Sequence, residues 1–356
     1  MQVLLSKADR ALGRLDGSIQ TLPNPDLFVY MYVRKEAVLS SQIEGTQSSL
    51  QDVLAAEAKV FSAVSANDVD EVVNYVAAMN HGLKRLTELP VSVRLIRELH
   101  AKLLEGVRGM HLAPGELRKT QNWIGPSGCT LHEAVHVPPP PHEVPIALGN
   151  LETFLHADTH LPLLVKIGLA HAQFETIHPF LDGNGRSGRL LITFLLCERE
   201  VLQKPVLYLS YYFKKYRQEY YERLQQIRDT GDWEQWLMFF LRGVIEVSAQ
   251  ATETARRILA LREEHRDAIA SNLGRAAGNG HRVLEYLYKN PIVSVNEVHD
   301  LLSISYPAAN NLVTRLTDCG IVKEITGHTR HRRYAYEHYI ALFRDDDGTD
   351  QPDETG

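Results

Sequence analysis

The sequence predicts a mainly α-helical protein with one small β-hairpin and, towards its C-terminus, a winged variant of the helix-turn-helix. Three observations lead to this prediction. Apolar residues recur at helical spacing through most of the first 245 residues. Between Pro114 and Val137 the pattern changes to short extended segments around glycines. After residue 280, three short helical segments are followed by two short strands.

Length and composition indicate a globular protein of more than one domain. The chain has 356 residues, of which 44% are hydrophobic and 23% charged. Its formal charge of −6 comes from the last twelve residues, which hold six acids and no Lys or Arg. Three widely separated cysteines match neither a disulfide framework nor a zinc site. Without a signal-peptide pattern or an apolar run long enough for a bilayer, we expect a soluble, cytoplasmic protein and no membrane contact.

The first part of the chain is expected to form helices. Apolar positions predict a helix over 26–41, and Gly45 follows it as a stop. Further helices are predicted over 49–60, from 67 or 68 to 83, and over 92–107. Two short strands around a turn are predicted over 123–128 and 129–137, and the prolines at 138–141 favour a rigid extended segment after them.

The second part continues in the same way. Pro162 suits the first position of a helix, which carries an apolar stripe to Ile177 and ends before Pro179. A second apolar helix is predicted from about Arg186 to Glu200, and the aromatic segment 210–243 is helical as well. The glycine-rich stretch 271–280 predicts a linker. Beyond it the pattern predicts helices over 282–290, 295–302 and 306–319 and strands over 322–325 and 334–336.

One stretch concentrates chemistry: His178-Pro-Phe-Leu-Asp-Gly-Asn-Gly-Arg-Ser-Gly-Arg189. Gly183 and Gly185 allow backbone amides to turn towards one point, and the next helix adds its free amides and its dipole, so the loop predicts an anion-binding nest. Arg186 and Arg189 lie three residues apart and can both face a polyphosphate.

The same stretch offers a metal ligand and a base. Asp182 supplies one hard oxygen, which suits a Mg²⁺ ion that keeps most of its waters and bridges phosphates. His178 is the side chain whose ordinary pKa lies nearest to neutral pH, so it is the candidate general base. Phe180 is expected to anchor the loop in the core.

Residues in and before this stretch also fit two other kinds of site, a dinucleotide site and a metal site. Gly183-x-Gly185-x-x-Gly188 matches the spacing of a dinucleotide-binding fingerprint, but a helix precedes it, not the strand that this fold requires. His171, Glu175 and His178 lie on one helical face and could hold a metal ion, although no Cys or further His is near them. The sequence contains no Walker A motif.

The stretch resembles the signature of Fic-domain proteins, His-Pro-Phe-x-Asp-Gly-Asn-Gly-Arg-x-x-Arg, at every specified position. The likeness extends over residues 2–243. It implies a Fic helical core with a β-hairpin flap. The expected domains are an N-terminal helical segment with an inhibitory motif (1–90), a Fic catalytic domain (91–245), a connecting helix and linker (246–280), a winged-helix domain (281–344) and an acidic disordered tail (345–356).

The resemblance also implies an activity, the transfer of AMP from Mg-ATP to a Ser, Thr or Tyr hydroxyl of a target protein. By that resemblance His178 deprotonates the hydroxyl and Asp182 holds Mg²⁺. The loop at Gly183, Asn184 and Gly185 grips the α-phosphate, Arg186 the β-phosphate and Arg189 the γ-phosphate. Family members that transfer phosphate from an inverted ATP have lysine where this chain has Gly185, so glycine here favours nucleotidyl transfer.

Three further features are implied by the same resemblance. Ser40-Ser-Gln-Ile-Glu44-Gly45 fits the family's inhibitory pattern, in which Glu44 pairs with Arg189 and occupies the γ-phosphate position. The predicted second strand, with Glu133, Ala134, Val135 and His136, corresponds to the flap that pins the target by strand pairing. Tyr220 and Tyr221 match a tyrosine pair that lines the adenine pocket, and a buried aromatic pair is the alternative.

The C-terminal domain suggests a second class of function, a DNA-binding regulator that uses the Fic site as a nucleotide sensor. Candidate DNA contacts are Asn310, Asn311, Arg315, Arg330, Arg332 and Arg333. Seven basic residues against six acidic ones between 280 and 343 leave no strongly basic face, so dimerisation or protein binding remains open. Removal of AMP in the same pocket is a third alternative, and a homodimer is among the partners considered.

Overall fold

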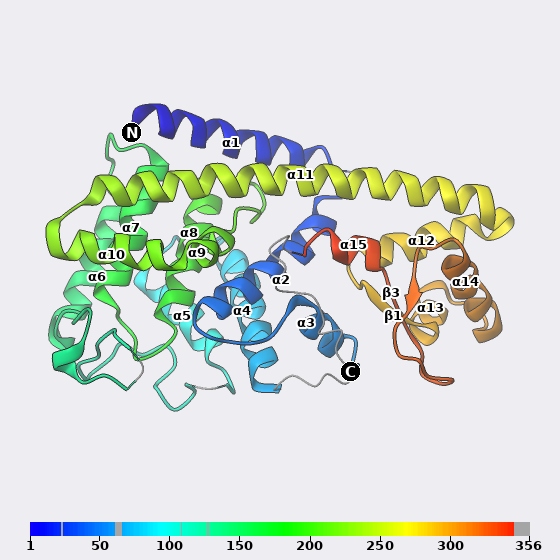
Figure 1. Ribbon diagram of the computed structural model, residues 1–356, viewed down its shortest axis with the longest axis horizontal. Helices are drawn as coiled ribbons and strands as arrows, with labels where there is room; N and C mark the ends of the chain where they lie inside the picture. Colours follow the sequence, from blue (N-terminus) through cyan, green and yellow to red (C-terminus); the bar gives the residue numbers. More distant parts are fainter. Residues whose placement is uncertain (23, 61–65, 108, 127, 345–356) are drawn as a thin grey trace. The chain divides into compact units, whose positions relative to one another are not determined.

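The computed structural model describes residues 1–22, 24–60, 66–107, 109–126 and 128–344. The predicted acidic tail over 345–356 lies outside them. Helices dominate the described residues, which form two compact units. Of the described residues, one unit takes those within 1–17, 36–49 and 66–251, and the other takes those within 18–35, 50–60 and 252–344. Figure 1 shows the elements in chain order. No helix of the described ranges has the length and apolar character to cross a membrane.

The first unit is built around two helices that are buried on nearly every side. α7 (Leu163–Ile177) and α8 (Asn184–Glu198) pack against each other, and their apolar side chains form the core. α6 (Val144–His156) and α10 (Arg217–Thr230) cover α7, while α4 (Ala66–Arg85) and α5 (Val93–Leu103) pack against α8. The unit also contains α9 (Ser210–Lys215), most of α1 (Gln2–Gln20), the second half of α2 (Pro25–Ile43) and the beginning of α11 (Trp233–Leu273).

The second unit contains a three-stranded antiparallel sheet near the C-terminus. Its strands are β1 (Ile292–Ser294), β2 (Lys323–Glu324) and β3 (Arg333–Ala335), in the order β1-β3-β2, with Val293 opposite Tyr334. The same unit also contains α3 (Leu50–Glu57), α12 (Ala277–Leu287), α13 (Val295–Leu302), α14 (Tyr306–Asp318) and α15 (Glu337–Ala341), with the first half of α2 and the remainder of α11. Strand β1 was not predicted. The winged-helix interpretation stays a prediction.

Two predicted elements were wrong. The two strands over 123–137 reduce to one antiparallel bridge between Ile124 and His136. A capping box between Thr130 and Glu133 closes a 3-10 turn over 131–133, and this turn satisfies locally the backbone donors that a second strand would have used.

The predicted linker over 271–280 is helical. α11 runs on to Leu273, a 3-10 turn covers Gly274–Ala276, and α12 begins at Ala277. The reason is packing. A Cβ on Gly280 would lie 2.7 Å from Leu273 Cδ2 and 2.9 Å from Ile269 Cγ2, so this glycine permits close contact between α11 and α12. Composition alone does not separate a glycine used for flexibility from one used for close approach.

Candidate active site

The stretch from His178 to Arg189 forms a loop between the end of α7 and the first turns of α8. His178 caps α7 in the left-handed conformation with φ 48°, and Gly183 caps α8 with φ 74°. Because a helix leaves its first backbone amides without an intrahelical partner, the start of α8 at this loop suits an anion site. Phe180 is fully buried, as expected for the anchor of the loop.

Two side chains that the sequence analysis did not single out hold the His178 end of the loop. Arg118 is buried, its Nε donates to His178 O at 2.9 Å, and its backbone N donates to Pro179 O at 3.0 Å. Asn122 Nδ2 donates to Phe180 O at 2.9 Å. These bonds orient the carbonyls next to the imidazole. Both residues lie some 60 positions before the loop, and no motif in the sequence indicated them.

A buried histidine and an asparagine hold the other end. His100 accepts from Gly115 N through Nδ1 at 2.8 Å, so its Nε2 donates to Asp182 O at 2.9 Å, and its ring stacks on Phe180 at 3.7 Å. Asn184 also holds this end. Its buried amide accepts from Phe180 N at 2.9 Å and donates to Phe180 O at 2.8 Å, so the side chain closes the loop, and its contact with phosphate stays a prediction.

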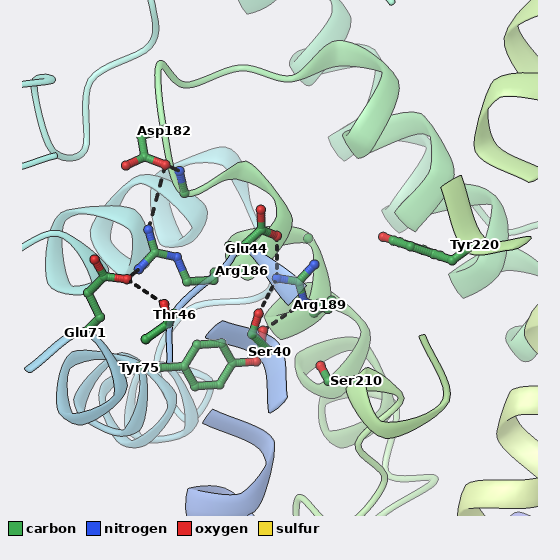
Figure 2. Close-up of polar contacts among 12 residues, drawn as sticks. Ser40, Glu44, Thr46, Glu71, Tyr75, Asp182, Arg186, Arg189, Ser210 and Tyr220 are labelled. Atoms are coloured by element: carbon green, nitrogen blue, oxygen red, sulfur yellow. Dashed lines mark hydrogen bonds and ion pairs between the residues drawn. The ribbon is translucent and has the colours of Figure 1, made fainter. Parts of the chain in front are cut away.

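Arg189 is held by the end of α2 (Figure 2). Its Nε donates to Ser40 Oγ at 2.8 Å, and its Nη2 donates to Ser40 O at 2.9 Å and to Glu44 Oε1 at 2.7 Å. Burial raises the pKa of the Glu44 carboxyl, but attraction to Arg189, Arg186 and His178 outweighs it and holds that pKa below its ordinary value. The ion pair is therefore charged at neutral pH.

Gly185 explains how the Glu44 carboxylate reaches the loop. A Cβ at position 185 would lie 2.2 Å from Glu44 Oε1 and 2.8 Å from Arg189 Nη1, closer than real contacts allow. The carboxylate therefore lies against the first turn of α8, at Gly185.

Two acidic side chains also lie beside Arg186. Its Nη1 lies 3.4 Å from Glu71 Oε2 on α4, and its Nη2 lies 3.8 Å from Asp182 Oδ1. Arg186 and Glu71 are both buried. Glu71 was not among the residues that the sequence analysis selected, because a single glutamate in a helix carries no pattern.

His178 is half-buried, and its Nδ1 is buried without a geometric hydrogen-bond partner in the described part of the chain. Burial, together with the positive charge of Arg228, lowers the pKa of the imidazole to about 4, against the opposing effect of Glu44. The ring is therefore neutral at pH 7. A neutral imidazole is able to accept a proton.

Asp182 fits the role of a single magnesium ligand. Its side chain remains 37% exposed, and its Oδ1 accepts from Gly183 N at 2.6 Å, which uses one of the several lone pairs of the carboxylate. The described residues contain no group of three or more His, Cys, Asp or Glu side chains placed to hold a metal ion. A single carboxylate suits a Mg²⁺ ion whose other ligands are water and phosphate oxygens. It does not suit an ion whose ligands must all come from the protein.

The alternative metal site on α7 does not form. His171 uses both ring nitrogens, with Nδ1 2.9 Å from Gly188 O and Nε2 2.9 Å from Tyr220 OH. Glu175 is buried, and burial raises the pKa of its carboxyl to about 7. Tyr220 is buried beside His171 and stacks on Phe213, whereas Tyr221 is 40% exposed. Contact of either tyrosine with adenine stays a prediction.

The predicted flap residues lie on the 3-10 turn and the bridge that follow Gly128. Glu133 is exposed and bonded to Thr130, Ala134 is half-buried, Val135 is exposed, and His136 Nε2 lies 3.0 Å from Thr176 O. Val135 N and His136 N both donate to Ile124 O, at 2.8 and 3.1 Å. Their contact with nucleotide or target stays a prediction.

In the second unit, the candidate DNA contacts are partly used by the protein itself. Arg332 Nη2 donates to Asn310 Oδ1 at 3.0 Å, and Arg315 Nη2 donates to Asn272 O at 2.8 Å. Arg330 and Asn311 are exposed. Arg330 and Arg332 line a polar cavity of about 370 Å³ together with residues that begin α13 and α14. DNA binding stays a prediction.

Comparisons with known proteins agree with this geometry. Residues 2–84 match the family described as Fic/DOC family N-terminal, and residues 90–196 match the Fic/DOC family. A protein adenylyltransferase Fic of Drosophila grimshawi is 30% identical over 193 residues, which cover 52% of this chain and 35% of that protein. The protein of the same name from Drosophila virilis is 27% identical over 261 residues, 72% of this chain and 47% of that protein. The chain thus spans between a third and a half of these curated relatives.

Solved structures share the fold. A Fic family protein from Desulfovibrio desulfuricans superposes with a TM-score of 0.60 at 20% identity, covering 94% of this chain and 95% of that one. Fic-1 from C. elegans, residues 134–508, superposes with a TM-score of 0.52 at 21% identity, covering 73% and 74%. Identities this low support the fold alone.

Proposed function

Because the chain belongs to the Fic/DOC family, we propose that it is a protein adenylyltransferase that transfers AMP from Mg-ATP to a hydroxyl group of a target protein. The observation that carries the proposal is the loop from His178 to Arg189, in which a neutral imidazole and two arginines surround the free amides of α8. The relatives named protein adenylyltransferase are consistent with it.

The reaction follows from these groups. ATP lies over the first turn of α8, with Arg186 and Arg189 binding the β- and γ-phosphates and the amides binding the α-phosphate. His178 takes the proton of the target hydroxyl as its oxygen bonds to the α-phosphorus. The bond from that phosphorus to the bridging oxygen breaks, and pyrophosphate leaves. Asp182 would hold Mg²⁺, whose charge neutralises that of the phosphates.

The described conformation corresponds to an inhibited state in this proposal. Glu44 occupies Arg189 and lies against Gly185, where the γ-phosphate would bind. A carboxylate and a phosphate that bind the same buried guanidinium repel each other strongly. ATP therefore binds productively only after the end of α2 has moved.

A target protein is proposed to dock at the flap. Large apolar side chains are exposed there, with Trp123 at 41%, Leu131 at 41% and Val135 at 56%. Exposed apolar groups beside a short β-bridge suit an extended segment that pairs through its backbone. The modified residue is then held near His178 mainly by main-chain contacts.

The experiment that tests the function uses ATP labelled at different phosphates. With α-labelled ATP and Mg²⁺, the Glu44→Gly variant is expected to label itself and a lysate protein covalently, because AMP carries the α-phosphate. With γ-labelled ATP no covalent label is expected, because that phosphate leaves in pyrophosphate. Covalent labelling from the γ-position would instead indicate phosphate transfer, and absence of both labels would refute the proposal.

The protonation state of His178 gives a second test. Its pKa of about 4 lies below the ordinary 6.5, so the neutral ring persists above about pH 4 and is lost only as the pH falls through that value. NMR of the protein with ¹⁵N-labelled histidine, with the His178 signals identified by their loss in His178→Ala, is expected to show a neutral ring from pH 8 down to about pH 5. A midpoint near 6.5 would contradict the burial argument.

A further inference from the structure

Arg186, like Arg189, is held by a carboxylate from outside the loop. Arg186 is 3% exposed and Glu71 is 2% exposed, and Nη1 of the arginine lies 3.4 Å from Oε2 of the glutamate. Glu71 belongs to α4, and the position of its carboxylate beside the guanidinium is visible in Figure 2. A buried ion pair of this kind contributes strongly to the orientation of both groups, because neither has water to replace its partner.

Glu71 is also tied to the inhibitory segment. Thr46, two residues after Glu44 and 3% exposed, donates from Oγ1 to Glu71 Oε2 at 3.1 Å. The next two residues contact the beginning of the same helix, since Gln47 N donates to Asp68 Oδ2 at 3.2 Å and Ser48 Oγ donates to Asp68 O at 3.3 Å. The segment that carries Glu44 is therefore fastened to α4 by three hydrogen bonds, one of which ends on the carboxylate that holds Arg186.

We propose that Glu71 is a second inhibitory carboxylate, which competes with the β-phosphate of a bound nucleotide for Arg186 and is coupled to Glu44 through Thr46. This inference rests on the nucleotide site proposed above. A phosphate drawn to Arg186 weakens its ion pair with Glu71 and brings two negative groups together in a buried site, so Glu71 opposes nucleotide binding.

The Thr46 hydrogen bond makes the two inhibitory contacts cooperative. Movement of the segment 44–46 away from α8 breaks the Glu44–Arg189 pair and, in the same step, removes a hydrogen bond that holds the Glu71 carboxylate in place. By linkage, a nucleotide that displaces Glu71 from Arg186 also favours release of Glu44. The site would then change between a closed state with both arginines engaged and an open state with both available.

ADP and AMP separate the two contacts. ADP has a β-phosphate, which would bind Arg186, but no γ-phosphate, which would bind Arg189. Its affinity therefore reports on Arg186 alone. AMP has neither phosphate. The affinities are measured by calorimetric titration in the presence of Mg²⁺. A His178→Ala background is used because it suppresses AMP transfer during the measurement. Glu71→Gln is expected to bind ADP about five- to tenfold more tightly than the background protein. AMP affinity is expected to stay the same.

Matched variants control the experiment. Asp70→Asn removes one negative charge from the exposed neighbouring position of α4 and is expected to leave ADP affinity unchanged. In a Glu44→Gly background, the gain from Glu71→Gln is expected to be smaller, because the segment is already released. Thr46→Val removes only the linking hydroxyl and is expected to strengthen ADP binding by about two- to fivefold, which keeps the inference testable if Glu71→Gln does not fold.

Some outcomes overturn the inference alone. Weaker ADP binding by Glu71→Gln would show that Glu71 orients Arg186 for phosphate. Unchanged ADP binding by Glu71→Gln would show that Glu71 does not compete with phosphate. If Glu71→Gln does not fold, unchanged ADP binding by Thr46→Val would show the same. Absence of ADP and ATP binding in every variant, including Glu44→Gly, would instead overturn the nucleotide site itself. The two failures are therefore distinguishable.

Discussion

Alanine in place of His178 is expected to lower AMP transfer by about 10²–10⁴-fold, the usual contribution of a general base. The hydroxyl of the target is a poor nucleophile until its proton is removed, and a neutral imidazole can accept that proton. ATP binding is expected to survive, because the predicted phosphate contacts come from Arg186, Arg189 and backbone amides. The measurement is the rate of labelling from α-labelled ATP in a Glu44→Gly background, beside calorimetric ATP affinity.

A second histidine serves as the control for that experiment. His81 lies on α4, is about one-third exposed and pairs with Glu98, so His81→Ala is expected to leave the transfer rate unchanged. Equal labelling by the His178 variant and its parent would show that another group, or none, removes the proton. A parallel loss of ATP affinity would show instead that the loop had lost its shape. The Arg118 and His100 contacts end on backbone carbonyls of the loop and do not depend on the His178 ring.

Glycine in place of Glu44 is expected to raise self-labelling by about one to two orders of magnitude, the range of typical coupling between sites. The carboxylate accepts from Arg189 at 2.7 Å and lies against Gly185, so it fills the position proposed for the γ-phosphate. Its removal leaves Arg189 held only by Ser40 among the partners described above. The guanidinium then has a free edge for a phosphate.

Two variants show whether charge or size is responsible. Glu44→Gln keeps the volume and removes the charge, so its labelling is expected to lie between that of the wild type and that of Glu44→Gly. Glu88→Gly places a glycine at an exposed glutamate and is expected to label as weakly as the wild type. An unchanged signal in Glu44→Gly, with ATP still bound, would remove autoinhibition by this residue from the proposal.

Local sequence carried much of the information about the site. The loop from His178 to Arg189 could be recognised because a helix end, two glycines and a helix start follow one another within twelve residues, and such geometry depends on neighbours along the chain. The pair of Glu44 with Arg189 was expected only through the resemblance to the Fic family. No spacing rule connects residues 145 positions apart.

The fold was predictable to a similar extent. Helical periodicity located α5, α7 and α14 to within a few residues, since an apolar stripe requires a buried face. The flap strands and the linker were predicted wrongly, because glycine and proline mark both turns and close packing. Only the neighbours in space decide between these uses: the Thr130 capping box in one case and the contact of Gly280 with Leu273 in the other.

The sequence by itself therefore determined the helical class, the loop and the identity of its charged groups, all of which depend on residues close together in the chain. Tertiary structure decided which partners those groups have. Arg186 meets Glu71 across 115 positions, His100 reaches Asp182 across 82, and Asn184 turns back onto Phe180. These contacts arise because burial forces each polar group to find a partner, and packing of distant helices determines which partner is within reach.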